Sequence, residues 1–177
     1  MAIIKGIEFT ESSYKLFIDI QTDIHQTIGK KRTVATIGTH DYKSVKGPFY
    51  YEGKAPKDIK FVPLKEDKPF TGIELVKHFE KQNDQAMIKY MGMIKSNPLW
   101  PVLIDSSGEI LSLPPVINSK YSQVSLQSTD ILLEVTSSTS LAICKEVMGV
   151  LLQRISKLIP FEQKLAVQQV KVLVSTC

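Results

Sequence analysis

A few polar side chains in this 177-residue sequence stand at positions where they could bind or transform a substrate. Glu134 and Thr136 interrupt the apolar run "ILLEVTS", and residues two apart on a strand share one face. Ser112 lies in "ILSLPP", and Asn118 follows the two prolines, which end strand pairing because neither has an N–H to donate. Together these groups suit a polar pocket. The alternative is a solvent-facing sheet and an ordinary turn, and the residues alone leave both open.

The histidines are His25, His40 and His78. His25 and His78 fall within helical patterns, where we expect a structural role. His40 follows the strand pattern "TVATIG" and precedes Asp41, and such a pair can bind a metal or move protons. Adjacent residues of an extended chain point to different sides, so a turn-stabilising role for His40 is the stronger expectation.

Other chemistries lack their sequence signatures. The glycines of "IGTHDYKSVKG" do not have the spacing that cradles a nucleotide, and no G-x-S-x-G motif marks a nucleophilic serine. Cys144 and the terminal Cys177 have no metal-type spacing, which favours a reducing compartment and predicts no metal. No run of about 18 apolar residues predicts a membrane span, and no export signal is visible.

Positive charge is concentrated in one part of the chain. The net charge is +4, and residues 30–68 alone hold ten lysines and arginines against five acidic residues. Such a segment suits a partner that carries phosphate. A solvated, lysine-rich loop that binds nothing is the alternative, and it is a common one.

Periodicity and turn signals predict the elements that position these side chains. We expect strands or extended segments at 2–8, 33–38, 58–64, 101–105, 109–113, 130–137 and 166–174, and helices at 11–28, 71–81, 84–94 and 141–155. Thr10 and the "TGIE" box at Thr71 are expected helix caps, Gly29 is expected to end the first helix, and "SSG" is expected to join a hairpin. Strands and helices do not alternate strictly. We therefore predict an α+β fold with mixed or antiparallel sheets and helices packed on one face.

The order of several motifs resembles a known family. "IGTHD", "DIKFVPL", "LSLPPVINS" and "ILLEVTS", in this order, resemble the beta subunit of cytosolic phenylalanyl-tRNA synthetase of the eukaryotic and archaeal type. The resemblance extends from about residue 7 to residue 155. It implies that residues 1–177 form a single editing domain without the aminoacylation module. That domain would hydrolyse, in the cytoplasm, the ester of tRNA(Phe) mischarged with tyrosine.

The resemblance also implies the residues of the site. It places these side chains around a polar-ended aromatic pocket: Leu103, Ser112, Asn118, Glu134 and Thr136, with Gln21, Arg32 and His40 nearby. Asn118, Glu134 and Thr136 would be catalytic, Glu134 or Ser112 would bind the tyrosine hydroxyl, and Asn118 and Arg32 would position the ester and the tRNA terminus. Lys30 and Lys31 would contact tRNA. With no obvious nucleophile, water would attack the ester directly.

The resemblance further implies partners and cofactors. The partners would be the acceptor end of tRNA(Phe), the tyrosine or phenylalanine moiety, and the alpha subunit through the rest of the beta chain, with no membrane. No cofactor is implied for this domain, whereas the whole synthetase would use ATP and magnesium in its catalytic module. Two other functions stay open: a non-catalytic tRNA-binding or structural module, and a domain that binds protein partners.

Overall fold

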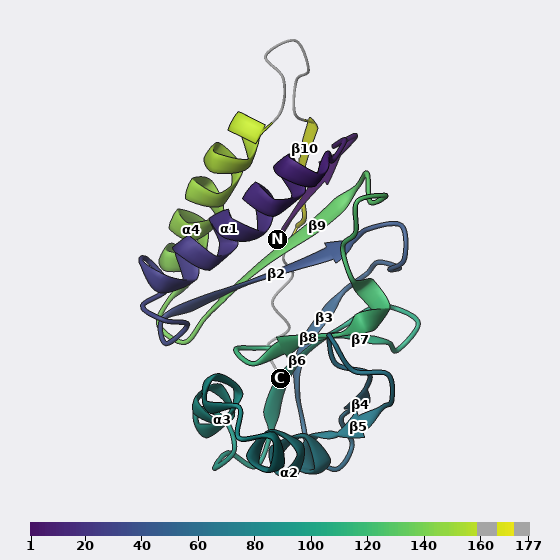
Figure 1. Ribbon diagram of the computed structural model, residues 1–177, viewed down its shortest axis with the longest axis vertical. Coiled ribbons are helices and arrows are strands. Elements are labelled where there is room, and N and C mark those ends of the chain that lie inside the picture. Colours follow the sequence, from purple (N-terminus) through teal and green to yellow (C-terminus); the bar gives the residue numbers. More distant parts are fainter. Residues whose placement is uncertain (159–165, 172–177) are drawn as a thin grey trace. The chain divides into compact units, whose positions relative to one another are not determined.

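The computed structural model describes residues 1–158 and 166–171 (Figure 1). The chain divides into two compact units. Unit 1 comprises Met1–Lys43 and Val124–Cys177, and unit 2 comprises Ser44–Gln123. Each unit has its own hydrophobic core and its own antiparallel sheet. The expectation that residues 1–177 act as one editing domain stays a prediction.

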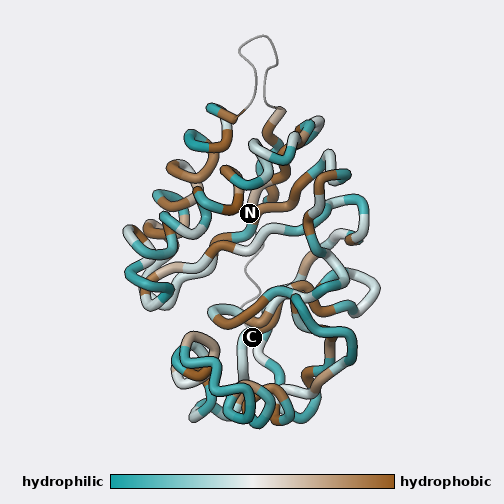
Figure 2. The backbone as a smooth tube through the Cα atoms, viewed as in Figure 1, coloured by the Kyte–Doolittle hydropathy of each residue, from teal (hydrophilic) through white to brown (hydrophobic). Residues whose placement is uncertain are grey.

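Unit 1 is a four-stranded sheet with two helices on one face. The strands are β1 (Ala2–Lys5), β2 (Ala35–Asp41), β9 (Ile131–Ser137) and β10 (Ala166–Gln169), in the order β10-β1-β9-β2. The helices α1 (Glu11–Gln26) and α4 (Leu141–Ile155) lie side by side over the sheet (Figure 1), and a short 3-10 turn, Ser156–Leu158, follows α4. Hydrophobic and hydrophilic residues alternate along both helices (Figure 2), so each buries one side against the strands.

The turn after α1 has an unusual backbone. Thr10 caps the helix in a capping box with Ser13, and α1 ends at Gln26, with Thr27 as its C-cap. Gly29 is therefore not the residue that ends the helix. A Cβ at Gly29 would lie 2.7 Å from the carbonyl oxygen of Ala35, so this position needs glycine for close approach of two backbone segments.

Lys30, Lys31 and Arg32 then adopt positive φ angles of 47°, 56° and 65°. Three consecutive non-glycine residues in this region are rare, because the left-handed conformation brings Cβ close to the backbone carbonyl. The Arg32 N–H donates to the carbonyl of His25 at 3.3 Å, which closes the turn. The result is a largely exposed turn that carries three cations.

Unit 2 contains a second four-stranded sheet, in the order β3-β6-β7-β8. Its strands are β3 (Tyr50–Lys54), β6 (Trp100–Ile104), β7 (Ile110–Leu113) and β8 (Ile117–Asn118). A small ladder of β4 (Lys60–Phe61) and β5 (Phe70–Thr71) leads into α2 (Gly72–Gln82) and α3 (Gln85–Gly92), and the 3-10 turn Lys120–Ser122 follows β8. The two helices, the ladder and one face of the sheet enclose the core of this unit.

The two prolines reverse the chain. The Val116 N–H donates to the Leu113 carbonyl at 2.8 Å, and the Pro114–Pro115 peptide bond is cis. This is the pattern of a tight turn with a cis-proline at its third position. Leu113 pairs with Ile117, and Ser112 pairs with Asn118. The double proline therefore does more than end β7, because it returns Asn118 to a position directly opposite Ser112.

The predicted fold class is confirmed, since every strand pairing of the described residues is antiparallel and helices cover one face of each core. The helix cap at Thr10, the capping box at Thr71 and the hairpin of residues 101–113 are also confirmed. Strand β3 was not predicted, and residues 58–64 contain only the two-residue β4. The end of the expected strand 166–174 and Cys177 lie outside the described residues.

We expect Asp105 to hold the β6–β7 hairpin. Its buried carboxylate accepts hydrogen bonds from the N–H groups of Lys46, Ser107 and Glu109 at 2.9–3.1 Å and from the Ser107 hydroxyl at 2.7 Å. Burial opposes ionisation, but these donors outweigh it and lower the pKa of Asp105. Asp105→Ala should lower the free energy of unfolding by about 2 kcal/mol in urea denaturation at pH 7. Ser106→Ala, in the same loop, is the control and should leave it unchanged.

Candidate functional site

One row of polar residues crosses the sheet of unit 1. Across β2 and β9, Thr36 pairs with Thr136, Gly38 with Glu134, and His40 with Leu132. The residues between them, including Ile37 and Leu133, belong to the core under the helices, so this row occupies the opposite face of the sheet. The hydroxyl groups of Thr36 and Thr136 are hydrogen-bonded at 2.7 Å. The expected sharing of one face by Glu134 and Thr136 is therefore observed.

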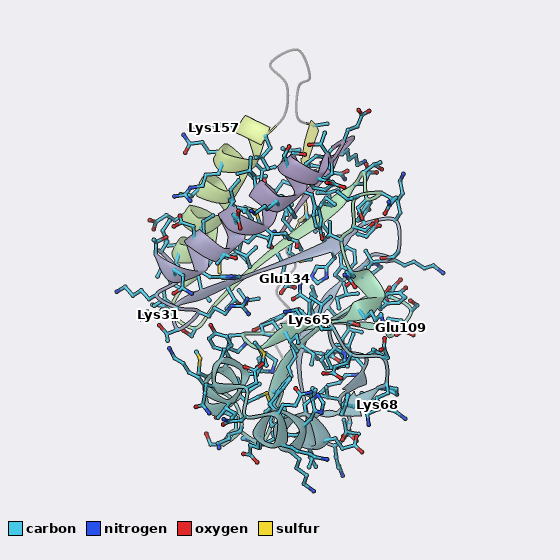
Figure 3. All side chains as sticks on the ribbon, in the orientation of Figure 1. Lys31, Lys65, Lys68, Glu109, Glu134 and Lys157 are labelled. Atoms are coloured by element: carbon cyan, nitrogen blue, oxygen red, sulfur yellow. The ribbon has the colours of Figure 1, made fainter. Side chains whose placement is uncertain are left out.

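Glu134 is seated directly over Gly38. A Cβ at Gly38 would lie 2.6 Å from Cγ, Cδ and Oε1 of Glu134, a separation that real Cβ atoms do not show. Glycine at this position therefore makes the space that the carboxylate occupies. Figure 3 labels Glu134 on its strand. The row consequently depends on Gly38, which is not among the expected site residues. Gly38 ends the pattern "TVATIG", and only the observed length of β2 places it inside a strand, where a glycine marks a site of close approach.

Glu134 and His40 form a buried acid–base pair. Their side chains are 4% and 0% exposed, and His40 Nε2 lies 3.6 Å from Glu134 Oε2. The expectation that His40 stabilises a turn is wrong, because β2 continues through Asp41 and places His40 inside the strand. The solvent-facing alternative for Glu134 is also wrong. A carboxylate this buried is normally paired or hydrogen-bonded, and such a group can accept a hydrogen bond from a substrate hydroxyl.

Gln21 lies on the helix side of the same sheet. Its amide oxygen accepts a hydrogen bond from the Thr39 hydroxyl at 3.2 Å, and its amide nitrogen donates to the Phe17 carbonyl at 3.1 Å. Thr39 alternates with Gly38 and His40 along β2, so it points to the other face. The structure thus places Gln21 in a buried polar contact between α1 and β2 rather than in the Glu134 row.

His25 links the basic turn to the edge of this sheet. Its Nε2 accepts a hydrogen bond from the Ile37 N–H at 2.8 Å, which satisfies a donor of the edge strand β2. Burial, together with the nearby positive charge of Arg32, lowers the pKa of His25 from 6.5 to about 3. The ring is therefore neutral near pH 7. The helical, structural role expected for His25 fits this geometry.

A second row crosses the sheet of unit 2. Leu103 pairs with Ser112, and Ser112 pairs with Asn118, so three expected site residues lie side by side on β6, β7 and β8. Their neighbours Val102 and Leu113 belong to the core, so the row occupies the other face of the sheet. Tyr51 pairs with Leu103 at the far end of the row and is largely exposed. Tyr51 is not among the expected site residues, because the sequence pattern does not predict β3.

The expected site residues thus fall into two groups. Leu103, Ser112 and Asn118 belong to unit 2, and the others belong to unit 1. Within unit 1 the structure brings Glu134, Thr136 and His40 onto one face, and it places Lys30, Lys31 and Arg32 in the turn after α1. That the eight residues other than Lys30 and Lys31 serve one pocket, and that these two lysines contact tRNA, stay predictions.

Among residues 1–158 and 166–171, no group of three or more His, Cys, Asp or Glu side chains could hold a metal ion. Over the same ranges, no helix is long and apolar enough to span a bilayer.

Comparison with known proteins shows similarity to one family. The chain is 43% identical over 136 residues, 77% of its length, to the phenylalanine–tRNA ligase beta subunit of Dictyostelium discoideum. It is 39% identical over 156 residues, 88% of its length, to the cytoplasmic beta subunit of Arabidopsis thaliana. These matches cover 22% and 26% of the relatives, so the chain spans about a quarter of their length. No family model matches the chain.

A solved structure has the same fold. The crystal structure of an N-terminal fragment of the phenylalanyl-tRNA synthetase beta subunit from Pyrococcus horikoshii aligns with a TM-score of 0.79 at 29% identity, over 88% of this chain and 43% of that one. Fold and sequence together define a segment of an aminoacyl-tRNA synthetase subunit. The chain belongs to the phenylalanine–tRNA ligase beta-subunit family.

Proposed function

We propose that this chain is an editing domain, which hydrolyses the ester that joins tyrosine to tRNA(Phe). The observation that carries the proposal is the buried carboxylate of Glu134, which Gly38 accommodates beside His40. A carboxylate held in this way is an acceptor for a phenolic O–H. Membership of the phenylalanine–tRNA ligase beta-subunit family supplies the reason to consider tyrosine, the amino acid that differs from phenylalanine by that hydroxyl alone.

Discrimination between the two amino acids needs such an acceptor. An apolar pocket rejects an added hydroxyl poorly, whereas a site that hydrogen-bonds the hydroxyl can discriminate strongly. Hydrogen bonds to a charged acceptor contribute about 1.5–3 kcal/mol. Glu134 is the first candidate acceptor, and Ser112, which is 1% exposed, is the second.

Hydrolysis would proceed by direct attack of water. The water oxygen bonds to the ester carbonyl carbon, and the bond from that carbon to the terminal ribose oxygen breaks. Tyrosine leaves with a new carboxyl group, and the ribose oxygen takes up the proton that the water loses. The side chains of Asn118 and Thr136, with the adjacent ribose hydroxyl, would orient the water and stabilise the developing oxyanion. This step needs no cofactor, and we propose none for this domain.

The basic turn after α1 is the proposed contact for the tRNA acceptor end. Lys30 and Lys31 are exposed, and Lys31 projects outward from the turn (Figure 3). The turn gathers three cations at consecutive positions, which suits a partner that carries phosphate groups. Arg32 would contact the tRNA terminus. We further propose that the longer cytoplasmic subunit of which this chain is a segment joins an alpha subunit, whose complex uses ATP and magnesium for aminoacylation elsewhere.

Release of tyrosine from tRNA tests this function. Tyrosyl-tRNA(Phe) and phenylalanyl-tRNA(Phe) are incubated with the alpha–beta enzyme, and the ester that remains is measured over time. The tyrosyl ester should disappear well above the buffer rate, and the phenylalanyl ester should not. Asn118→Ala should slow release of tyrosine by about 100-fold if it orients the attacking water. Asn97→Ala, an exposed asparagine of unit 2, should have no effect.

A non-catalytic tRNA-binding module is the second candidate, and the exposed turn of three consecutive cations favours it. Under that function, the enzyme would release tyrosine no faster than buffer, and Asn118→Ala would change nothing. Lys31→Ala would then weaken tRNA binding with no catalytic effect to accompany it. The same assay therefore separates the two candidates.

A further inference from the structure

Unit 2 contains a pocket whose lining residues are separate from those of its polar row. The pocket has a volume of about 600 Å³ and is lined by α2, by the segment before β4 and by the start of β6. Its lining residues are Ala55, Pro56, Lys57, Ile73, Val76, Lys77, Glu80, Lys95 and Trp100. None of them is among the proposed site residues. A hollow of this size is within the range of ligand-binding pockets.

One stripe of α2 forms a wall of the pocket. Ile73, Val76, Lys77 and Glu80 are spaced three and four apart, so they lie on one side of the helix. Leu75 and Phe79 point to the core instead, where they are buried. Ile73 is 47% exposed, which is high for an isoleucine in a helix of a packed unit. Ile73 therefore presents apolar surface in the pocket that the core of unit 2 does not bury, next to Val76, which packs partly buried against that core.

The floor of the pocket is rigid. The Gly72 N–H donates to the Pro56 carbonyl at 3.0 Å, which ties the start of α2 to the segment before β4. A Cβ at Gly72 would lie 2.8 Å from the Trp100 ring, so Trp100 packs tightly against the first turn of α2. The hollow is thus formed by packed elements, and a ligand would meet a preformed surface.

The rim is positively charged. Lys57, Lys77 and Lys95 come from three different segments, and Glu80 is the single acidic residue among them. Charged rims of this kind select partners of opposite charge and speed their association. The phosphates of a nucleic acid would match the charge, but its bases bind proteins by stacking on exposed aromatic rings, and Trp100 is only 2% exposed. An acidic peptide segment with a large apolar side chain matches both properties.

We propose that this pocket is a docking site for an acidic protein segment, in which leucine or phenylalanine fills the hollow and flanking aspartates or glutamates pair with the lysines. Ile73 and Val76 contact the anchor side chain beside the largely buried ring of Trp100. The proposal does not depend on the editing function. The pocket would instead give this chain a protein-binding role.

Trp100 provides the measurement, because it is the only tryptophan in the sequence and lines the pocket. The probe is a capped peptide without tryptophan or tyrosine, in which leucine and phenylalanine are flanked by aspartate and glutamate. It is titrated into the protein while the Trp100 emission and the heat of binding are recorded. We expect a saturable change that weakens as salt is raised.

Matched variants locate the binding. Lys77→Glu and Ile73→Ser should each weaken binding about tenfold, equivalent to about 1.4 kcal/mol. Lys89→Glu changes the net charge in the same way on exposed α3, outside the pocket, and should leave binding within about twofold. Thermal unfolding of each variant checks that the fold is retained.

Three results would overturn the proposal. The first is no emission change and no heat with the probe at about 1 mM, the weak limit of specific binding. The second is equal binding of a peptide with serine in place of leucine and phenylalanine, or stronger binding of an oligouridylate, which would identify a plain anion or RNA surface. The third is an equal effect of Lys89→Glu and Lys77→Glu.

Discussion

Replacing Glu134 with alanine should reduce hydrolysis of tyrosyl-tRNA(Phe) about 50-fold and leave that of phenylalanyl-tRNA(Phe) nearly unchanged. The reason is the loss of a charged acceptor for the phenolic hydroxyl, which contributes about 1.5–3 kcal/mol, and each 1.36 kcal/mol is a factor of ten in rate. The measurement is kcat/KM for deacylation of both esters by the alpha–beta enzyme. The ratio of the two values, rather than either alone, reports recognition of the hydroxyl.

The controls separate recognition from folding. Glu146→Ala removes an exposed carboxylate from α4 of the same unit and should change neither ester. Gly38→Ala keeps the carboxylate of Glu134 but fills the space that it occupies. Like Glu134→Ala, it should therefore lower kcat/KM for the tyrosyl ester. Equal loss for both esters in Glu134→Ala would contradict a role in recognising the hydroxyl. If only Ser112→Ala lowers kcat/KM selectively for the tyrosyl ester, Ser112 is the residue that recognises the hydroxyl.

Local signals in the sequence predicted much of the fold. Thr10 and Thr71 each begin a helix with a capping box, in which side-chain oxygens accept hydrogen bonds from backbone N–H groups three residues away. The hairpin around Gly108 follows from a glycine that adopts φ of 88°. These features depend on neighbours in sequence, so periodicity and residue type are sufficient to find them.

Features that depend on distant residues were harder to predict. His40 was expected at a turn because "TVATIG" ends at Gly38, yet pairing with β9 extends β2 through Asp41. Gly29 was expected as a helix end, but its small size is needed against Ala35. The exposed β3 has no alternating pattern, so only its pairing with β6 defines it.

The candidate site also combines features that depend on neighbours in sequence, which were predicted, with features that depend on strand pairing, which were not. Alternation along β9 correctly placed Glu134 and Thr136 on one face, and the two prolines correctly indicated a bend before Asn118. That Asn118 returns opposite Ser112 follows from the register of β7 and β8, which a sequence does not state. Gly38 became visible as a site residue only when its cross-strand partner, Glu134, was known.

The second large effect concerns pH. The pKa of His25 is lowered to about 3 in the folded chain by burial and by Arg32, against an ordinary value of 6.5. Between these two values the unfolded chain binds more protons, so the free energy of unfolding rises with pH in that window. At pH 5 this single group should destabilise the fold by about 2 kcal/mol relative to pH 7.

His25→Gln tests this account, because glutamine can still accept a hydrogen bond and does not titrate. Urea denaturation at pH 7, 6 and 5 should give the variant a smaller loss of stability between pH 7 and 5, by about 2 kcal/mol. Arg32→Gln should also reduce the loss, because removing its charge raises the pKa of His25. Identical pH dependence in wild type and His25→Gln would mean that the ring does not stay neutral in the folded chain. The hydrogen bond from Ile37 to Nε2 would then not be the contact that holds the edge of β2 to α1.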